Sequence, residues 1–117
     1  MPDVIPVLPV TDIDRAASFY GPLGFVEDTR AADYLILVHP IGIELHFHLE
    51  GRWGVGGSNH SGAAYIRFAT ADEARYLHRA WAEHLALPEP HQTNYGLLEF
   101  LVVDPFGNTV TVGGSTG

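Results

Sequence analysis

The residues best suited to chemistry in this 117-residue chain are one acid and two histidines that alternate along a short segment. Glu44, His46 and His48 are separated by Leu45 and Phe47, so in a β-strand the three polar side chains point the same way. Carboxylates and imidazoles are ligands for zinc and other divalent metals. Ligands on one straight strand stand roughly 6–7 Å apart, however, and bonds of about 2 Å cannot easily bring all three to one ion. The cluster therefore indicates a polar cleft wall or solvent face, or a metal site completed from other strands.

Two further segments carry polar residues on one face of an expected strand. Tyr65 and Arg67 alternate with Ile66 in residues 63–69, and Thr111 lies between the apolar Val110 and Val112. These faces are candidates for the wall of a cleft, and plain exposure to solvent is the alternative.

Composition excludes several function classes. The net charge is −8, from 14 acidic and 6 basic residues, which argues against nucleic-acid binding. The charge favours solubility, and attraction of a cationic ligand is the sharper alternative. The absence of cysteine excludes disulfides, thiolate metal sites and a cysteine nucleophile. Without a run of about 18 apolar residues or a signal-peptide pattern, we expect a cytoplasmic protein with no membrane partner.

The elements that must position these residues come in two similar sets. Residues 35–47 read LILVHPIGIELHF and residues 100–112 read FLVVDPFGNTVTV, which aligns Pro40 with Pro105 and Gly42 with Gly107. Each copy is an apolar run, a turn signal and an alternating run, the pattern of a β-hairpin. A repeated hairpin implies a repeated module, and two modules can enclose a cleft.

Each half of the chain predicts the order βαβββ. Helices are expected after Thr11 with Asp14, and after the capping box from Thr70 to Glu73. The second helix should bury the stripe Ala74, Leu77, Trp81 and Leu85. The expected strands cover residues 4–10, 25–29, 33–38, 43–49, 63–69, 91–94, 97–103 and 109–113. The histidines outside the cluster, expected on loops or on a helix surface, are His60, His78, His84 and His91.

The fold class predicted is α+β, in a single domain over residues 1–117. Two tandem modules, at about 3–50 and 63–114 with a loop at 51–62, should form a curved, cleft-enclosing mixed sheet with the helices outside. Pro6 and Pro9 place the first strand at an edge or at an unusual junction. An apolar strand at an edge needs a partner.

The chain resembles the vicinal oxygen chelate superfamily of glyoxalases, bleomycin-resistance proteins and extradiol dioxygenases. The resemblance rests on VTDIDRAASFYGPLGF, on the paired modules and on YGLLEFLVVDPFGNTVTV. It implies that metal-dependent members would place ligands at Ile5, His46, Ala63 and Thr111. Only His46 could ligate well, which implies no metal, no cofactor and no catalysis. The alternative is a metal-dependent lyase or dioxygenase with a shifted site at Glu44, His46 and His48.

The drug-binding branch, similar in its proline-bearing opening strand, implies a protein that sequesters a planar aromatic antibiotic and so confers resistance. Tyr34, Tyr65 and Tyr95 match aromatic residues that line or stack in its cleft. A homodimer with clefts at the interface is implied, with strand exchange through Ile5, Pro6, Val7 and Pro9. The family often has a basic residue where Leu97 stands, which favours a ligand other than bleomycin. The ligand-binding residues implied are Tyr34, Glu44, His46, His48, Tyr65, Arg67, Tyr95 and Thr111.

Overall fold

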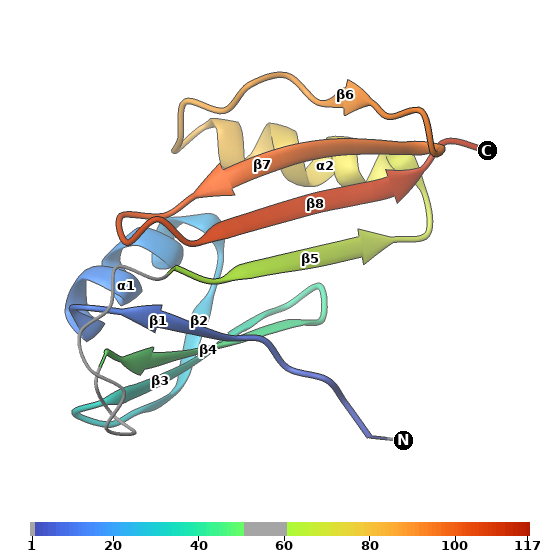
Figure 1. Ribbon diagram of the computed structural model, residues 1–117. Coiled ribbons are helices and arrows are strands. Elements are labelled where there is room, and N and C mark those ends of the chain that lie inside the picture. Colours follow the sequence, from blue (N-terminus) through green and yellow to red (C-terminus); the bar gives the residue numbers. More distant parts are fainter. Residues whose placement is uncertain (1, 51–60) are drawn as a thin grey trace. The chain divides into compact units, whose positions relative to one another are not determined.

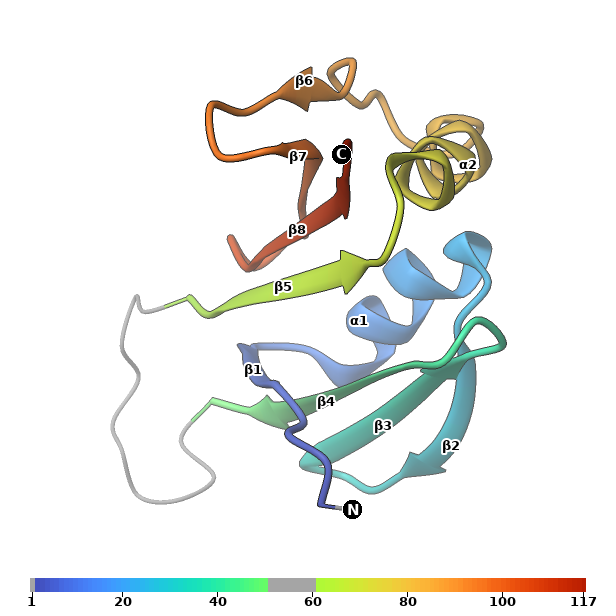
Figure 2. The ribbon, with the colours of Figure 1, turned by 90° about the vertical axis from the view of Figure 1, so that its right-hand side faces the viewer.

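A computed structural model describes residues 2–50 and 61–117, and most of the loop expected at 51–62 lies outside the described residues. The chain divides into two compact units (Figures 1 and 2). Unit 1 holds residues 1–63 with 104–108, and unit 2 holds residues 64–103 with 109–117. No helix in the described part of the chain is long and apolar enough to span a membrane.

Unit 1 is a four-stranded mixed sheet with one α-helix packed on it. Its strands lie in the order β1-β4-β3-β2, with β1 parallel to β4 and the other pairs antiparallel. The alternation expected in β4 is confirmed, because Ile43, Leu45 and Phe47 are buried and Glu44, His46 and His48 are half-buried on the other face. The elements are β1 (Val7–Val10), α1 (Ile13–Tyr20), the 3-10 turn η1 (Gly21–Leu23), β2 (Val26–Arg30), β3 (Tyr34–His39) and β4 (Ile43–Leu49).

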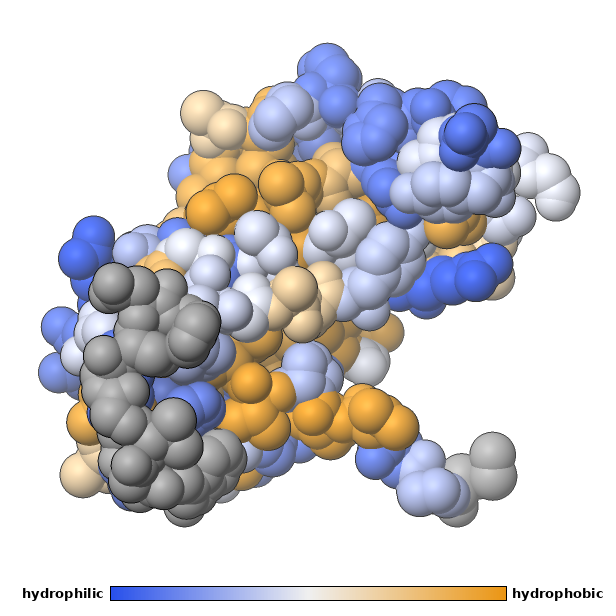
Figure 3. Space-filling view, viewed as in Figure 1, coloured by the Kyte–Doolittle hydropathy of each residue, from blue (hydrophilic) through white to orange (hydrophobic). Residues whose placement is uncertain are grey.

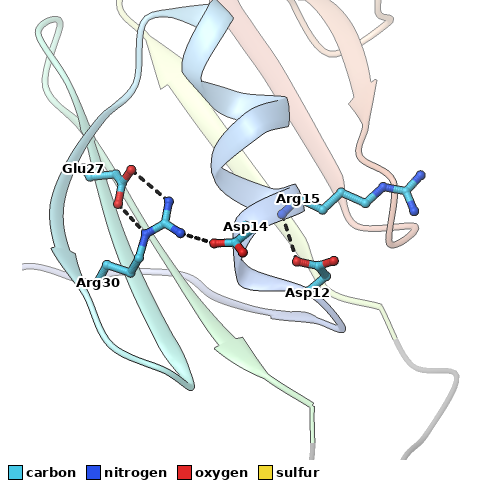
Figure 4. A network of polar contacts seen from close by, with 5 residues as sticks. All are labelled: Asp12, Asp14, Arg15, Glu27 and Arg30. Carbon is cyan, nitrogen blue, oxygen red and sulfur yellow. Dashed lines mark hydrogen bonds and ion pairs between the residues drawn. The ribbon is translucent and has the colours of Figure 1, made fainter.

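Helix α1 begins one residue later than its sequence signal suggests. The N-cap is Asp12, whose carboxylate accepts a hydrogen bond of 3.0 Å from the backbone N–H of Arg15, so the expected cap at Thr11 is wrong. Both residue types can cap, and an ionised carboxylate also interacts favourably with the helix dipole. Near this end, Arg30 makes a bidentate pair with Glu27 at 2.7 and 2.9 Å and also bonds Asp14 (Figure 4).

Unit 2 repeats the plan with a second mixed sheet. Its strands lie in the order β5-β8-β7-β6, with β7 antiparallel to both neighbours and β5 running in the same direction as β8 (Figure 1). The capping box of the second helix is confirmed, since Thr70 and Glu73 exchange side-chain and backbone hydrogen bonds. The elements are β5 (Ala63–Phe68), α2 (Ala71–Ala82), β6 (His91–Gln92), β7 (Leu97–Val103) and β8 (Thr109–Ser115). The predicted α+β class with two βαβββ sets is therefore confirmed.

Helix α2 buries most of its expected stripe, and one histidine that was expected at the surface. Ala74, Leu77 and Trp81 are buried, whereas Leu85 lies beyond the end of the helix and is half-buried. His78 is 7% exposed, which corrects its expected surface position. Its Nε2 donates to the Pro88 carbonyl at 2.9 Å because the chain folds back after the helix, a long-range contact that periodicity does not report. His84 and His91 are exposed, and His60 lies outside the described residues.

The two hairpin turns share one geometry, which confirms the repeat seen in the sequence. Gly42 donates to the His39 carbonyl at 2.9 Å, and Gly107 donates to the Asp104 carbonyl at 3.1 Å. Their φ angles of +101° and +83° lie in the left-handed region that favours glycine. The side chain opening each turn accepts a backbone N–H two residues on.

The second turn also supplies a buried polar network to unit 1. Asp104 and Asn108 are 5% and 0% exposed. Asn108 donates to the Pro9 carbonyl at 2.8 Å and accepts from the Gly62 N–H at 2.6 Å. Tyr20 of α1 donates to Asp104 at 2.8 Å. These contacts fix the C-terminal part of β1, whereas Val4, before the strand, is 97% exposed on a largely apolar segment (Figure 3).

Candidate ligand-binding site

Three of the predicted residues in unit 1 form a chain of hydrogen bonds. The Tyr34 hydroxyl lies 2.7 Å from Nδ1 of His46, and Nε2 of the same ring lies 2.6 Å from Oε2 of Glu44. A carboxylate oxygen accepts, so Nε2 of His46 donates to Glu44, and the tautomer with its proton on Nε2 accepts from Tyr34 on Nδ1. Glu44 and His46, two residues apart on β4, are thus joined because both side chains are long enough to span the distance between their backbone positions.

This arrangement does not fit a metal centre. A divalent ion could reach His46 only by taking a ring nitrogen from Tyr34 or Glu44. At the other ligand positions that the resemblance implies, Ile5 and Ala63 offer no side-chain ligand and Thr111 offers a hydroxyl. Among residues 2–50 and 61–117, no group of three or more His, Cys, Asp or Glu could hold a metal ion.

His48 lies on the same face of β4, one step beyond His46. It pairs in register with Tyr34 of β3, and its Nδ1 lies 3.3 Å from the carbonyl oxygen of Leu49. All four predicted ligand residues of unit 1 therefore occupy one half-buried face, the face opposite the core.

In unit 2, the two predicted tyrosines converge on a carboxylate. Glu99 of β7 is 7% exposed. It accepts a hydrogen bond of 2.7 Å from the Tyr65 hydroxyl of β5 and two contacts of 3.0 Å from the Tyr95 hydroxyl. His91 of β6 is the register partner of Glu99, and its Nε2 lies 4.0 Å from Oε1.

A glycine makes room for this cluster. Gly113 of β8 faces Glu99 in register, and a Cβ built on it would lie 2.0 Å from the Tyr65 hydroxyl oxygen. Any other residue at position 113 would displace Tyr65 from the carboxylate. The absence of one side chain therefore lets Tyr65 reach Glu99 across β8.

The electrostatics of the cluster keep both phenols protonated. Partial burial, the hydrogen bond to Glu99 and the nearby carboxylate charge raise the pKa of Tyr65 to about 12. The hydrogen bond to Glu99 is the largest cause that raises the pKa of Tyr95. Both tyrosines therefore act as hydrogen-bond donors toward Glu99 at neutral pH.

The same face of unit 2 carries further predicted and exposed residues. Arg67 follows Tyr65 on β5 and is exposed, and Thr111 is half-buried opposite Leu101. Leu101 and Val103 are 41% and 55% exposed. The face is thus a partly apolar surface that also carries a buried carboxylate.

Glu99 was not among the predicted site residues. Its signal was available: it is the single charged residue within LLEFLVV, a run whose other members are apolar. A carboxylate in such a strand is seldom buried without partners. Which partners it has depends on Tyr65 and Tyr95, which spacing alone does not bring together.

The two βαβββ units with their mixed sheets are those of the vicinal oxygen chelate fold, as the sequence resemblance implied. No protein-family model and no curated protein sequence matches the chain significantly. A bleomycin-binding protein complexed with bleomycin has a TM-score of 0.79 and 22% identity, covering 98% of this chain and 99% of that one.

Two further solved structures show the range of proteins with this fold. A bleomycin-binding protein from Streptomyces verticillus, complexed with copper(II)-bleomycin, has a TM-score of 0.73 and 24% identity over 100% of this chain and 97% of that one. A lactoylglutathione lyase from Agrobacterium tumefaciens has a TM-score of 0.72 and 18% identity, covering 96% and 92%. The fold thus occurs in both a binding protein and an enzyme, so function must be argued from the site.

Proposed function

We propose that this protein binds a planar aromatic small molecule, such as an antibiotic, and sequesters it without catalysis. The observation that carries the proposal is the state of His46. It is the one good ligand among the family's metal positions, and both its ring nitrogens are engaged by Tyr34 and Glu44. The chelate chemistry of the enzymes requires an ion that polarises substrate oxygens, and these residues do not provide for one.

The exposed aromatic residues support binding of a flat ligand. Tyr65 and Tyr95 are 46% and 64% exposed, and their hydroxyls are anchored on Glu99. Anchored rings lose little further freedom when a ligand stacks on them, and each stacked pair contributes about 0.5–1.5 kcal/mol beyond burial. Similarity in fold to two proteins whose structures contain bleomycin is consistent with this function.

A homodimer remains part of the proposal. Val7–Val10 pairs with β4 of its own chain, and the Pro6 carbonyl accepts from the His46 N–H at 3.1 Å. In the proposed dimer, exchange through Ile5, Pro6, Val7 and Pro9 would replace these contacts with the same contacts to a second copy, reached by the segment before β1. Its exposed Val4 is the kind of apolar side chain that such a contact would cover. Gel filtration with light scattering at micromolar concentration tests this, and a monomer would contradict it.

The test of binding is calorimetric titration with a panel of planar aromatic antibiotics, alongside elemental analysis of the purified protein. We expect micromolar or tighter binding of at least one compound, unchanged chemically after recovery, and protection of a sensitive bacterial host that expresses the protein. Absence of binding across the panel would contradict the proposal. Stoichiometric zinc, iron, manganese or nickel that is lost in His46→Ala would instead favour the enzyme.

A further inference from the structure

We propose that Glu99, Tyr65 and Tyr95 form the receptor for a protonated nitrogen of the ligand, so that the protein selects planar aromatic cations with N–H donors. This inference rests on the proposed function and names the class of ligand that the site in unit 2 would take.

The first step is that Glu99 has no lysine or arginine partner among residues 2–50 and 61–117. The chain has no lysine, and no arginine among the described residues pairs with Glu99. Its neighbours are two neutral phenols and His91, an exposed imidazole 4.0 Å away. Buried carboxylates are usually paired with a cation, because an ionised group is costly to desolvate. A cation brought by the ligand would complete this site.

The second step is the direction of the hydrogen bonds. Tyr65 and Tyr95 each have one hydroxyl proton, and each points it at Glu99. Their oxygens can then only accept hydrogen bonds from a ligand. The cluster as a whole presents acceptors backed by negative charge, so it favours an N–H donor and disfavours a carbonyl or an anion.

The third step is access. Tyr65 and Tyr95 are 46% and 64% exposed, so a ligand can reach their oxygens and ring faces although Glu99 itself is buried. Aromatic faces also attract cations. The net charge of −8 also attracts a cationic ligand at long range.

Arg67 gives the competing possibility of an anionic ligand, because it lies on the same face of β5. It is exposed, and among the described residues it has no hydrogen bond or ion pair that would hold its guanidinium in place. A charge in this setting is screened by solvent, whereas Glu99 is buried and held by two donors. We therefore assign the selectivity to Glu99.

The experiment compares two acridines of similar size by calorimetry: 9-aminoacridine, a planar cation with N–H donors, and acridine-9-carboxylate, a planar anion. The wild-type protein should bind the cation at least about tenfold more tightly than the anion, equivalent to about 1.4 kcal/mol. Glu99→Gln, which keeps the size of the side chain and replaces the carboxylate by a neutral amide, should abolish that preference. Higher salt should weaken binding of the cation.

Two further variants separate the site from general effects. Glu89→Gln makes the same change of charge at an exposed carboxylate and should leave the preference within about twofold of wild type. Tyr95→Phe removes one acceptor oxygen from an exposed ring, so the variant should fold normally. It should weaken binding of 9-aminoacridine more than binding of acridine-9-carboxylate. Circular dichroism checks that Glu99→Gln is folded, and the result for Tyr95→Phe stands independently of it.

The outcomes distinguish the two proposals. Equal binding of the two acridines, or an equal effect of Glu99→Gln on both, overturns the cation receptor but leaves planar binding in place. The cation receptor is also overturned if other planar compounds bind and 9-aminoacridine does not. If no planar compound binds the wild-type protein, the proposed function fails and this inference fails with it.

Discussion

Removing the hydroxyl of Tyr20 should destabilise the protein by about 2 kcal/mol. Tyr20 is 1% exposed, and its hydroxyl donates to Oδ2 of Asp104 at 2.8 Å. The substitution Tyr20→Phe keeps the ring, which packs against Phe25 and Phe47 at centroid distances of 5.6 and 4.9 Å. The change is therefore confined to one buried hydrogen bond.

The magnitude follows from what Asp104 retains. Its carboxylate still accepts from the backbone N–H of Phe106 and from the backbone and side chain of Asn108, each at 2.9 Å. The carboxylate therefore loses one hydrogen-bond donor of four. A hydrogen bond to a charged group contributes about 1.5–3 kcal/mol, and the remaining donors argue against a larger loss.

Urea unfolding followed by circular dichroism measures this change. The midpoint should fall while the slope m is unchanged, since the surface exposed on unfolding is nearly the same. The matched control is Tyr76→Phe on α2, whose side chain is 65% exposed and which should change stability by less than about 0.5 kcal/mol. If Tyr20→Phe behaves like this control, the buried network does not hold unit 1 as we describe.

Three further predictions concern unit 2. Gly114→Ala should reduce the free energy of unfolding by at least about 2 kcal/mol, because its Cβ would lie 2.1 Å from the backbone oxygen of Thr70. Gly113→Ala should cost less, because the atoms that its Cβ would meet belong to the side chains of Tyr65 and Glu99 and not to the backbone. Urea unfolding compares the two variants. Ultraviolet titration of tyrosinate should show one residue ionising near pH 12 in wild type and nearer to pH 10 in Gly113→Ala. The folded state raises the pKa of Tyr65 to about 12, so its contribution to stability is complete below about pH 10 and is lost as the pH rises toward 12. Thr70→Ala should cost about 1 kcal/mol through loss of the helix cap, measured as a lower urea midpoint.

The order of elements could be predicted from the sequence because it rests on short-range patterns. Alternation in β4 and β8 places one side chain in the core and the next outside it, and the Pro-x-Gly turns fix where each strand reverses. The capping box at Thr70 is likewise a local device, since its partner stands three residues on. Such contacts depend on neighbours that the sequence itself places together.

The site could be predicted only in part, for the opposite reason. The chain Tyr34–His46–Glu44 and the convergence on Glu99 depend on side-chain reach across strands, which spacing does not specify. The burial of His78 depends on where the chain returns after α2. The family resemblance supplied Tyr34 and Tyr95 as candidates, and the structure shows what holds each of them.

The two repeated hairpins carry different side chains at equivalent positions. When the hairpins are aligned, Tyr34 corresponds to Glu99 and His48 corresponds to Gly113. In each unit these two residues are register partners on the face opposite the core. In unit 1 both positions carry large side chains. In unit 2 the glycine opens the space that the Tyr65 hydroxyl enters to reach the carboxylate. A carboxylate at position 99 without glycine at 113 would lose Tyr65 as a donor, so the cation receptor requires both departures from the first copy.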